Sequence, residues 1–106
     1  MVERTINKEI LNSINEYVKE IKKHYNITTI ILFGSYAKGT YNENSDIDIA
    51  VVSEDFEDIY DCMAKLMGMT WDIDARTEPH PIRKKDYEEA NDYFIQEIVD
   101  TGIKVA

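Results

Sequence analysis

A buried strand that ends at a glycine is the feature that most constrains this fold. Residues 28–33 are all apolar or β-branched, a pattern typical of a strand that is buried on both faces, and they run directly into Gly34-Ser35. Glycine lets the backbone turn sharply and approach a ligand, while the amides that follow carry partial positive charge. A Gly-Ser turn alone is more often an ordinary strand-to-helix connection. With its neighbours it predicts a phosphate-binding turn, in which Ser35 adds a hydroxyl donor and Lys38 a nearby charge.

Two aspartates on the next predicted strand indicate a metal site. The alternation of residues 46–52 places Asp46, Asp48 and Ala50 on one face of that strand. Neighbouring carboxylates in a semi-buried site cannot both stay ionised without a compensating charge. Mg²⁺ supplies that charge and prefers carboxylate, phosphate and water oxygens. The alternative for an isolated pair is a solvated strand edge, but this inner face is a costly place for unpaired charge.

Hydrophobic periodicity completes a single α/β unit of order αβαβαβα. With 43% apolar residues, the chain can bury one core, so we expect one domain over residues 1–106. Pro79 and Pro81 are expected to break regular structure, and Gly102 to end the last helix. The predicted helices are Asn7–Tyr25, Ser35–Lys38, Phe56–Met67 and Lys84–Asp100, and the predicted strands are Thr28–Phe33, Asp46–Val52 and Thr70–Arg76.

Composition restricts the partners and the compartment. The formal net charge of -9 disfavours an extended nucleic-acid footprint, which requires the opposite sign. Residues 1–4 lack a signal pattern, and no apolar run approaches the roughly 20 residues of a membrane span. Cys62 is the single cysteine, so no internal disulfide can form. We therefore expect a cytoplasmic protein with no membrane association.

The combined motif resembles that of a known family. Gly34-Ser35, ten intervening residues and then Asp46-x-Asp48 is similar to the signature of the DNA polymerase β-like nucleotidyltransferase superfamily. The fuller stretches Leu32–Gly39 and Ser45–Val51 resemble its minimal nucleotidyltransferase (MNT) branch, and the resemblance covers nearly the whole chain. It implies a small mixed sheet of three or four strands flanked by helices.

The resemblance also implies a third carboxylate on a neighbouring strand, completing a site for two Mg²⁺ ions. Asp72 and Asp74 are the candidates, and periodicity cannot separate them because both lie on one face of the predicted strand. We favour Asp74, because Asp74-x-Arg76-x-Glu78-Pro79 looks like the usual ending of this strand in the branch. For Arg76, a phosphate contact and an ion pair with Glu78 remain equally open.

By the same resemblance, the reaction is transfer of AMP from ATP to a hydroxyl. Asp46 and Asp48 would bridge the metals, Asp74 would help to deprotonate the acceptor, and Gly34 and Ser35 would hold the β- and γ-phosphates. The branch implies a HEPN ribonuclease toxin as partner, silenced by AMP on a tyrosine. A binding antitoxin that acts by occlusion and a small-molecule nucleotidyltransferase are the alternatives.

Two histidines remain outside the motif. His24 lies near the end of a predicted helix, where an exposed imidazole that interacts with the helix dipole is the simplest interpretation. His80, between two prolines, is expected either to contact substrate or to position its loop.

Overall fold

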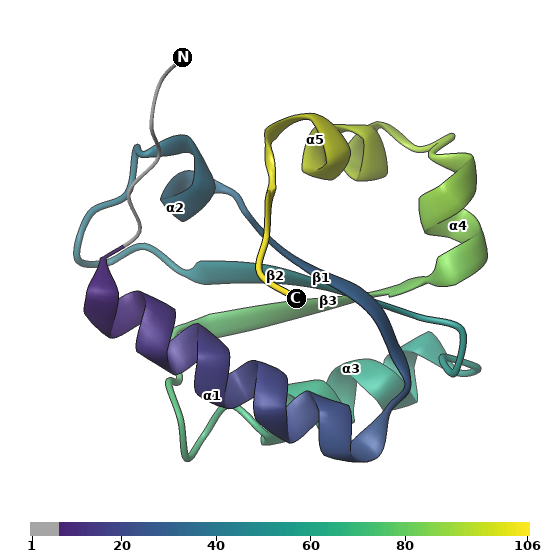
Figure 1. Ribbon diagram of the computed structural model, residues 1–106, viewed down its shortest axis with the longest axis horizontal. Helices are drawn as coiled ribbons and strands as arrows, with labels where there is room; N and C mark the ends of the chain where they lie inside the picture. Colours follow the sequence, from purple (N-terminus) through teal and green to yellow (C-terminus); the bar gives the residue numbers. More distant parts are fainter. Residues whose placement is uncertain (1–6) are drawn as a thin grey trace.

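The computed structural model describes residues 7–106, which form a four-stranded sheet with helices on both faces (Figure 1). Residues 1–6 of the predicted domain lie outside the described residues. The elements in chain order are α1 (Lys8–His24), β1 (Ile27–Phe33), α2 (Ser35–Lys38), β2 (Ile47–Ser53), α3 (Ile59–Gly68), β3 (Thr77–Arg83), α4 (Lys84–Glu89), α5 (Tyr93–Thr101) and β4 (Ile103–Lys104).

The sheet is mixed, with the strand order β3-β2-β1-β4. β1 runs antiparallel to both of its neighbours, β2 and β4, whereas β2 and β3 are parallel. A parallel pair needs a long crossover connection, and the segment that contains α3 provides it. The predicted α/β class, with a small mixed sheet flanked by helices, is confirmed.

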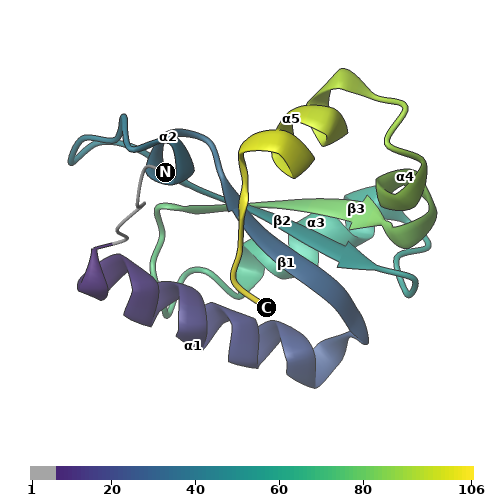
Figure 2. The same ribbon diagram turned by 45° about the horizontal axis from the view of Figure 1, so that its top comes forward.

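The helices cover the two faces unequally. α1 and α3 pack against one face, and α4 and α5 lie over the other (Figures 1 and 2). Ile47, Ile49 and Val51 of β2 belong to the larger core, whereas Ala50 and Val52 belong to the smaller core under α5. Side chains alternate along a strand, so Asp48 shares the α5 face with Ala50, as the sequence predicts.

Side-chain caps determine where the helices begin. Asn7 accepts a hydrogen bond from the amide of Glu9 at 2.8 Å, so α1 follows its predicted range closely. Asp58 accepts from two amides of the first turn of α3, which therefore starts at Ile59 rather than at Phe56 as predicted. No helix within residues 7–106 combines the length and the apolarity needed to cross a membrane.

The prediction of a third strand at Thr70–Arg76 is wrong. Those residues form turns, and the strand that pairs with β2 is Thr77–Arg83, so it begins after Arg76. Pro79 and Pro81 lie inside this strand instead of interrupting it. They are tolerated because β3 is an edge strand, where a residue without an N–H breaks no ladder if its nitrogen faces outward.

The predicted helix Lys84–Asp100 is two helices. Ala90 adopts φ +48° at the end of α4, and Asp92 then caps α5 by accepting from the amide of Phe94 at 2.6 Å. Gly102 ends α5 as predicted. The short strand β4 that follows it was not predicted, because two paired residues are too few to show an alternating pattern.

Candidate active site

Gly34 brings the backbone at the end of β1 against the side chain of Asp48. Its φ of +74° and ψ of −151° belong to a region that is open almost only to glycine. A Cβ placed on residue 34 would overlap Oδ2 of Asp48 and lie 3.2 Å from its Cγ. Both the conformation and the contact therefore require glycine, and they fix the turn at Ser35 beside a carboxylate.

Ser35 opens the single helical turn of α2. The amide of Lys38 donates to the carbonyl of Gly34 at 3.0 Å, and the amide of Thr40 donates to the carbonyl of Ser35 at 3.0 Å. Burial of Tyr36 and Ala37 holds the turn in place. The predicted strand, glycine turn and helical turn are thus present, while the phosphate ligand assigned to Gly34 and Ser35 stays a prediction.

An acidic cluster gathers at the start of the parallel pair. Asp48 on β2 stands beside Glu78 on β3 in the strand register, and Asp46 immediately precedes β2. Ligand atoms of Asp48, Glu78 and His80 all lie within 4.8 Å of one another. A carboxylate-rich donor set of this size fits a divalent cation such as Mg²⁺.

Glu78 occupies the position at which the sequence analysis expected Asp74. Glu78 is exposed, but its partial desolvation raises the pKa of its carboxyl, His80 lowers it, and the negative charges of Asp48 and Asp46 raise it further. Glu78 was not predicted as a site residue because the predicted strand ended at Arg76. The alternation of Glu78, His80 and Ile82 within Thr77–Arg83 is the signal that could have revealed it.

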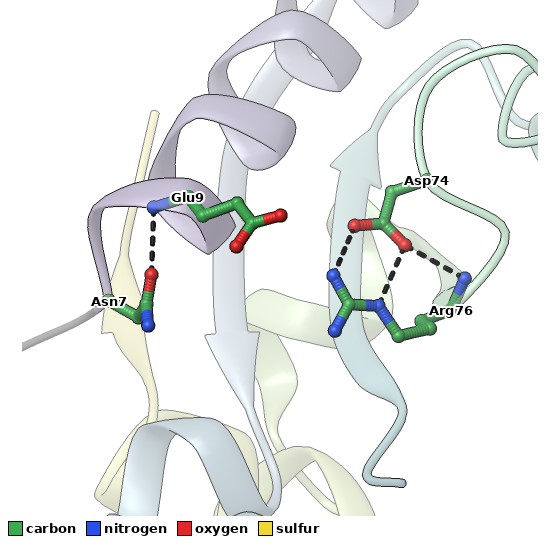
Figure 3. Close-up of polar contacts among 4 residues, drawn as sticks. All are labelled: Asn7, Glu9, Asp74 and Arg76. Atoms are coloured by element: carbon green, nitrogen blue, oxygen red, sulfur yellow. Dashed lines mark hydrogen bonds and ion pairs between the residues drawn. The ribbon is translucent and has the colours of Figure 1, made fainter. Parts of the chain in front are cut away.

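Asp74 is engaged by Arg76. The guanidinium donates to both carboxylate oxygens, with Nε–Oδ1 3.0 Å and Nη2–Oδ2 2.8 Å, and the Arg76 amide donates to Oδ1 at 3.1 Å (Figure 3). These contacts, led by the guanidinium, lower the pKa of Asp74. Asp74 was assigned to the metal site because it was expected on the third strand. That reason is wrong, since Asp74 lies in the turns that precede β3. Arg76 pairs with Asp74 and not with Glu78.

Asp72, the alternative to Asp74, lies elsewhere. It is exposed in the turns after α3 and lines a depression together with Glu20 and His24 of α1. That depression is separate from the one next to Asp46 and Glu78, so Asp72 does not join the acidic cluster.

Lys38 already has a partner within the chain. Its Nζ lies 2.7 Å from Oε1 of Glu97, and this exposed ion pair links α2 to α5. A phosphate contact by Lys38, as predicted, would have to compete with Glu97.

A depression of about 340 Å³ adjoins the acidic cluster on the β3 side. Asp46, Glu78 and Arg76 form its polar wall, and Met63 and Met67 of α3 form its apolar wall. It therefore offers space for a second reactant next to the carboxylates.

Comparison with known proteins establishes the family. Residues 13–106 match the family described as "Polymerase beta, Nucleotidyltransferase", so the chain belongs to the polymerase β nucleotidyltransferase family. Two similar proteins of Methanocaldococcus jannaschii are each named "Putative protein adenylyltransferase". The first is 48% identical over 52% of this chain and 58% of its own length, and the second is 32% identical over 76% and 90%. The chain thus spans little more than half of the first relative.

Solved structures show the same fold. The crystal structure of a toxin-antitoxin with AMP-PNP is 27% identical, with a TM-score of 0.67 over 91% of this chain and 72% of that one. The crystal structure of a protein of Sulfolobus solfataricus described as a "putative nucleotidyltransferase" has a TM-score of 0.66 over 91% of this chain and 80% of that one, at 21% identity. These findings confirm the resemblance to the minimal branch.

Proposed function

We propose that this chain is a minimal, single-domain nucleotidyltransferase that transfers AMP from ATP, with Mg²⁺, to a hydroxyl of a toxin protein in the cytoplasm. The acceptor is a tyrosine of a HEPN-type ribonuclease, and the chain acts as its antitoxin. The observation that carries the proposal is the acidic cluster of Asp46, Asp48 and Glu78 beside the Gly34-Ser35 turn. The names of the M. jannaschii relatives and the AMP-PNP-bound toxin-antitoxin neighbour support the choice of nucleotide and partner.

The site residues divide into a phosphate side and an acceptor side. Gly34 and Ser35 end β1, Asp48 lies on β2, and Glu78 lies on β3, so the carboxylates separate the turn from the edge of the sheet. In-line phosphoryl transfer requires the attacking and leaving oxygens on opposite sides of the phosphorus. The order of the strands, β3-β2-β1, suits a pyrophosphate that leaves towards Ser35 at the end of β1 and an acceptor that arrives from the side of β3.

The chemistry follows from this division. Bound Mg²⁺ would neutralise the carboxylates and stabilise the charge that develops on the phosphate oxygens. Glu78 takes the proton of the acceptor hydroxyl. The hydroxyl oxygen of the acceptor then forms a bond to the α-phosphorus, while the bond from the α-phosphorus to the oxygen that bridges it to the β-phosphate breaks and pyrophosphate leaves. Asp46, Asp48 and Glu78 would hold the metal, and Glu78 replaces Asp74 in both roles that the sequence analysis assigned, as third metal ligand and as base.

The acceptor comes from another molecule. The depression lined by Met63 and Met67 beside Glu78 gives a partner side chain access to the carboxylates. The net charge of -9 suits a basic partner such as a ribonuclease, because opposite charge favours encounter and orientation.

Intact mass spectrometry tests this function. The protein, its genomically adjacent partner, Mg²⁺ and each nucleoside triphosphate are mixed, and the partner is weighed. We expect a gain of one or more AMP units with ATP, lost in Asp46→Asn/Asp48→Asn and retained in Asp72→Asn, whose carboxylate lies outside the cluster. An unchanged partner mass with a stable complex contradicts transfer.

Occlusion of the partner is the second candidate, favoured by the large negative charge. Transfer and occlusion can be separated by measuring whether the chain protects cells against the toxicity of the partner. Loss of protection with Asp48→Asn, in a variant that still binds the partner, supports chemistry, whereas full protection by that variant supports occlusion.

A further inference from the structure

His80 places an imidazole nitrogen among the carboxylates of the acidic cluster. Its Nε2 is buried, has no hydrogen-bond partner within the described residues, and lies 3.5 Å from Oδ1 of Asp48. At that separation the two groups are too far apart for a good hydrogen bond. A buried polar atom without a hydrogen-bond partner requires an explanation, and binding of an ion is one such explanation.

The surroundings fix the direction of this nitrogen. His80 stands opposite Ala50 in the β2–β3 register, and the small alanine leaves the ring room above the sheet. Phe33 and Phe94 pack on the ring, with centroid distances of 5.0 Å and 5.6 Å. The imidazole is therefore held by its neighbours with Nε2 turned towards Asp48.

The spacing suits shared coordination. Adjacent ligands of an octahedral ion with bonds of about 2.1 Å are about 3 Å apart. The Asp48–His80 distance of 3.5 Å is close to this value, and Glu78 completes a group whose ligand atoms lie within 4.8 Å of one another. A small inward movement of the three side chains would close the set around one ion.

We infer that Nε2 of His80 is a direct ligand of the cation held by Asp48 and Glu78, so that this position takes Mn²⁺ in preference to Mg²⁺. Mn²⁺ binds oxygen ligands as Mg²⁺ does but, as a transition metal, also accepts an imidazole nitrogen, whereas Mg²⁺ is held by oxygen. The inference rests on the proposed nucleotidyltransferase function and refines it. His80 would give nitrogen ligation to the ion held with Asp48 and Glu78, whereas Asp46 and Asp48 would hold a second ion through oxygen alone.

Binding of Mn²⁺ to the full chain, without nucleotide, tests the inference. Free Mn²⁺ is followed by its electron paramagnetic resonance signal, and Mg²⁺ affinity is obtained by competition. His80→Gln is expected to weaken Mn²⁺ binding about tenfold or more and to change Mg²⁺ binding much less. His24→Gln is the matched control, because His24 is exposed beside Glu20 on α1, and it is expected to bind Mn²⁺ as the unchanged protein does.

Pulsed electron paramagnetic resonance of the unchanged protein gives a readout that does not depend on any variant folding. Bound Mn²⁺ is expected to show a ¹⁴N modulation, which His80→Gln removes and His24→Gln keeps. Bound Mn²⁺ without that modulation, or equal Mn²⁺ affinity in His80→Gln, overturns the inference. Asp48→Asn separates this failure from failure of the proposed function: Mn²⁺ binding that survives Asp48→Asn overturns both, whereas binding lost in Asp48→Asn but unchanged in His80→Gln overturns the role of His80 alone.

Discussion

Gly34 and Asp48 occupy adjoining space: a Cβ on residue 34 would overlap the Asp48 carboxylate. The end of β1 and the middle of the acidic cluster are thereby held together by a direct contact. The Gly34-Ser35 turn and the Asp48 carboxylate therefore cannot shift independently of each other.

Gly34→Ala is expected to abolish nucleotide transfer and to destabilise the fold, because the new methyl group displaces Asp48 and the backbone region is unfavourable for alanine. The conformational strain alone costs about 1–3 kcal/mol. Nucleotide transfer and the free energy of unfolding are the measurements.

Gly39→Ala is the matched control. Gly39 also has a positive φ, +77°, but nothing lies within 4 Å of an added Cβ. It should cost about 1–2 kcal/mol of stability and retain transfer. Equal activity in the two variants would show that the contact with Asp48 has no catalytic importance.

Glu78→Gln and Asp74→Asn are expected to have opposite effects. Glu78→Gln should lower the rate of transfer by about 10²–10⁴-fold and leave stability nearly unchanged, because it removes the proposed base from an exposed position. Asp74→Asn should retain transfer and lose about 1 kcal/mol or less, since its partner Arg76 is partly exposed. Single-turnover rates together with urea unfolding decide the matter, and the reverse pattern would restore Asp74 as the third carboxylate.

The ion pair of Asp74 should also appear in the pH dependence of stability. The pKa of Asp74 is lowered from 3.8 by Arg76, so the ionised form is favoured in the folded state. Its contribution is present above the unfolded pKa and is lost as the pH falls through the folded pKa. Thermal midpoints between pH 6 and pH 2.5 should therefore fall less steeply in Asp74→Asn than in the unchanged protein. Parallel curves would show that the pair does not act in solution.

Lys38 and Glu97 allow a test of opposite sign. Glu97→Gln frees the ammonium and is expected to tighten ATP binding, whereas Lys38→Met should weaken it. Either change should alter stability by less than about 1 kcal/mol, because both side chains are exposed. Calorimetric titration with ATP and Mg²⁺ measures the affinities. Equal affinity in all three proteins would remove Lys38 from the nucleotide site.

The predictable part of the fold and site is the part encoded locally. The buried run before Gly34, the single turn to Gly39 and the alternation of Asp48 with Ala50 each arise from neighbouring residues, so the sequence was sufficient to find them. To predict Glu78 as a site residue, one would have to know which segment pairs with β2, and this pairing depends on tertiary contacts. Trp71–Arg76 and Thr77–Arg83 both alternate, and only the second pairs with β2.

Prolines and caps account for the other errors. Pro79 and Pro81 suggested a break because their position at the edge of the sheet could not be known in advance. The predicted last helix is divided at Ala90, which adopts a left-handed conformation although alanine favours helices. Asp92 then caps the start of a second helix, α5.

The two prolines of β3 also determine how a partner can approach the site. Residues two apart on a strand direct their backbone groups to the same side, so Pro79 and Pro81 leave the outer edge of β3 without two successive N–H donors. A partner strand could not extend the sheet along this edge by a regular ladder. For the proposed acceptor we therefore expect delivery as a projecting side chain, recognised by the shape of the surface beside Glu78 rather than by strand addition.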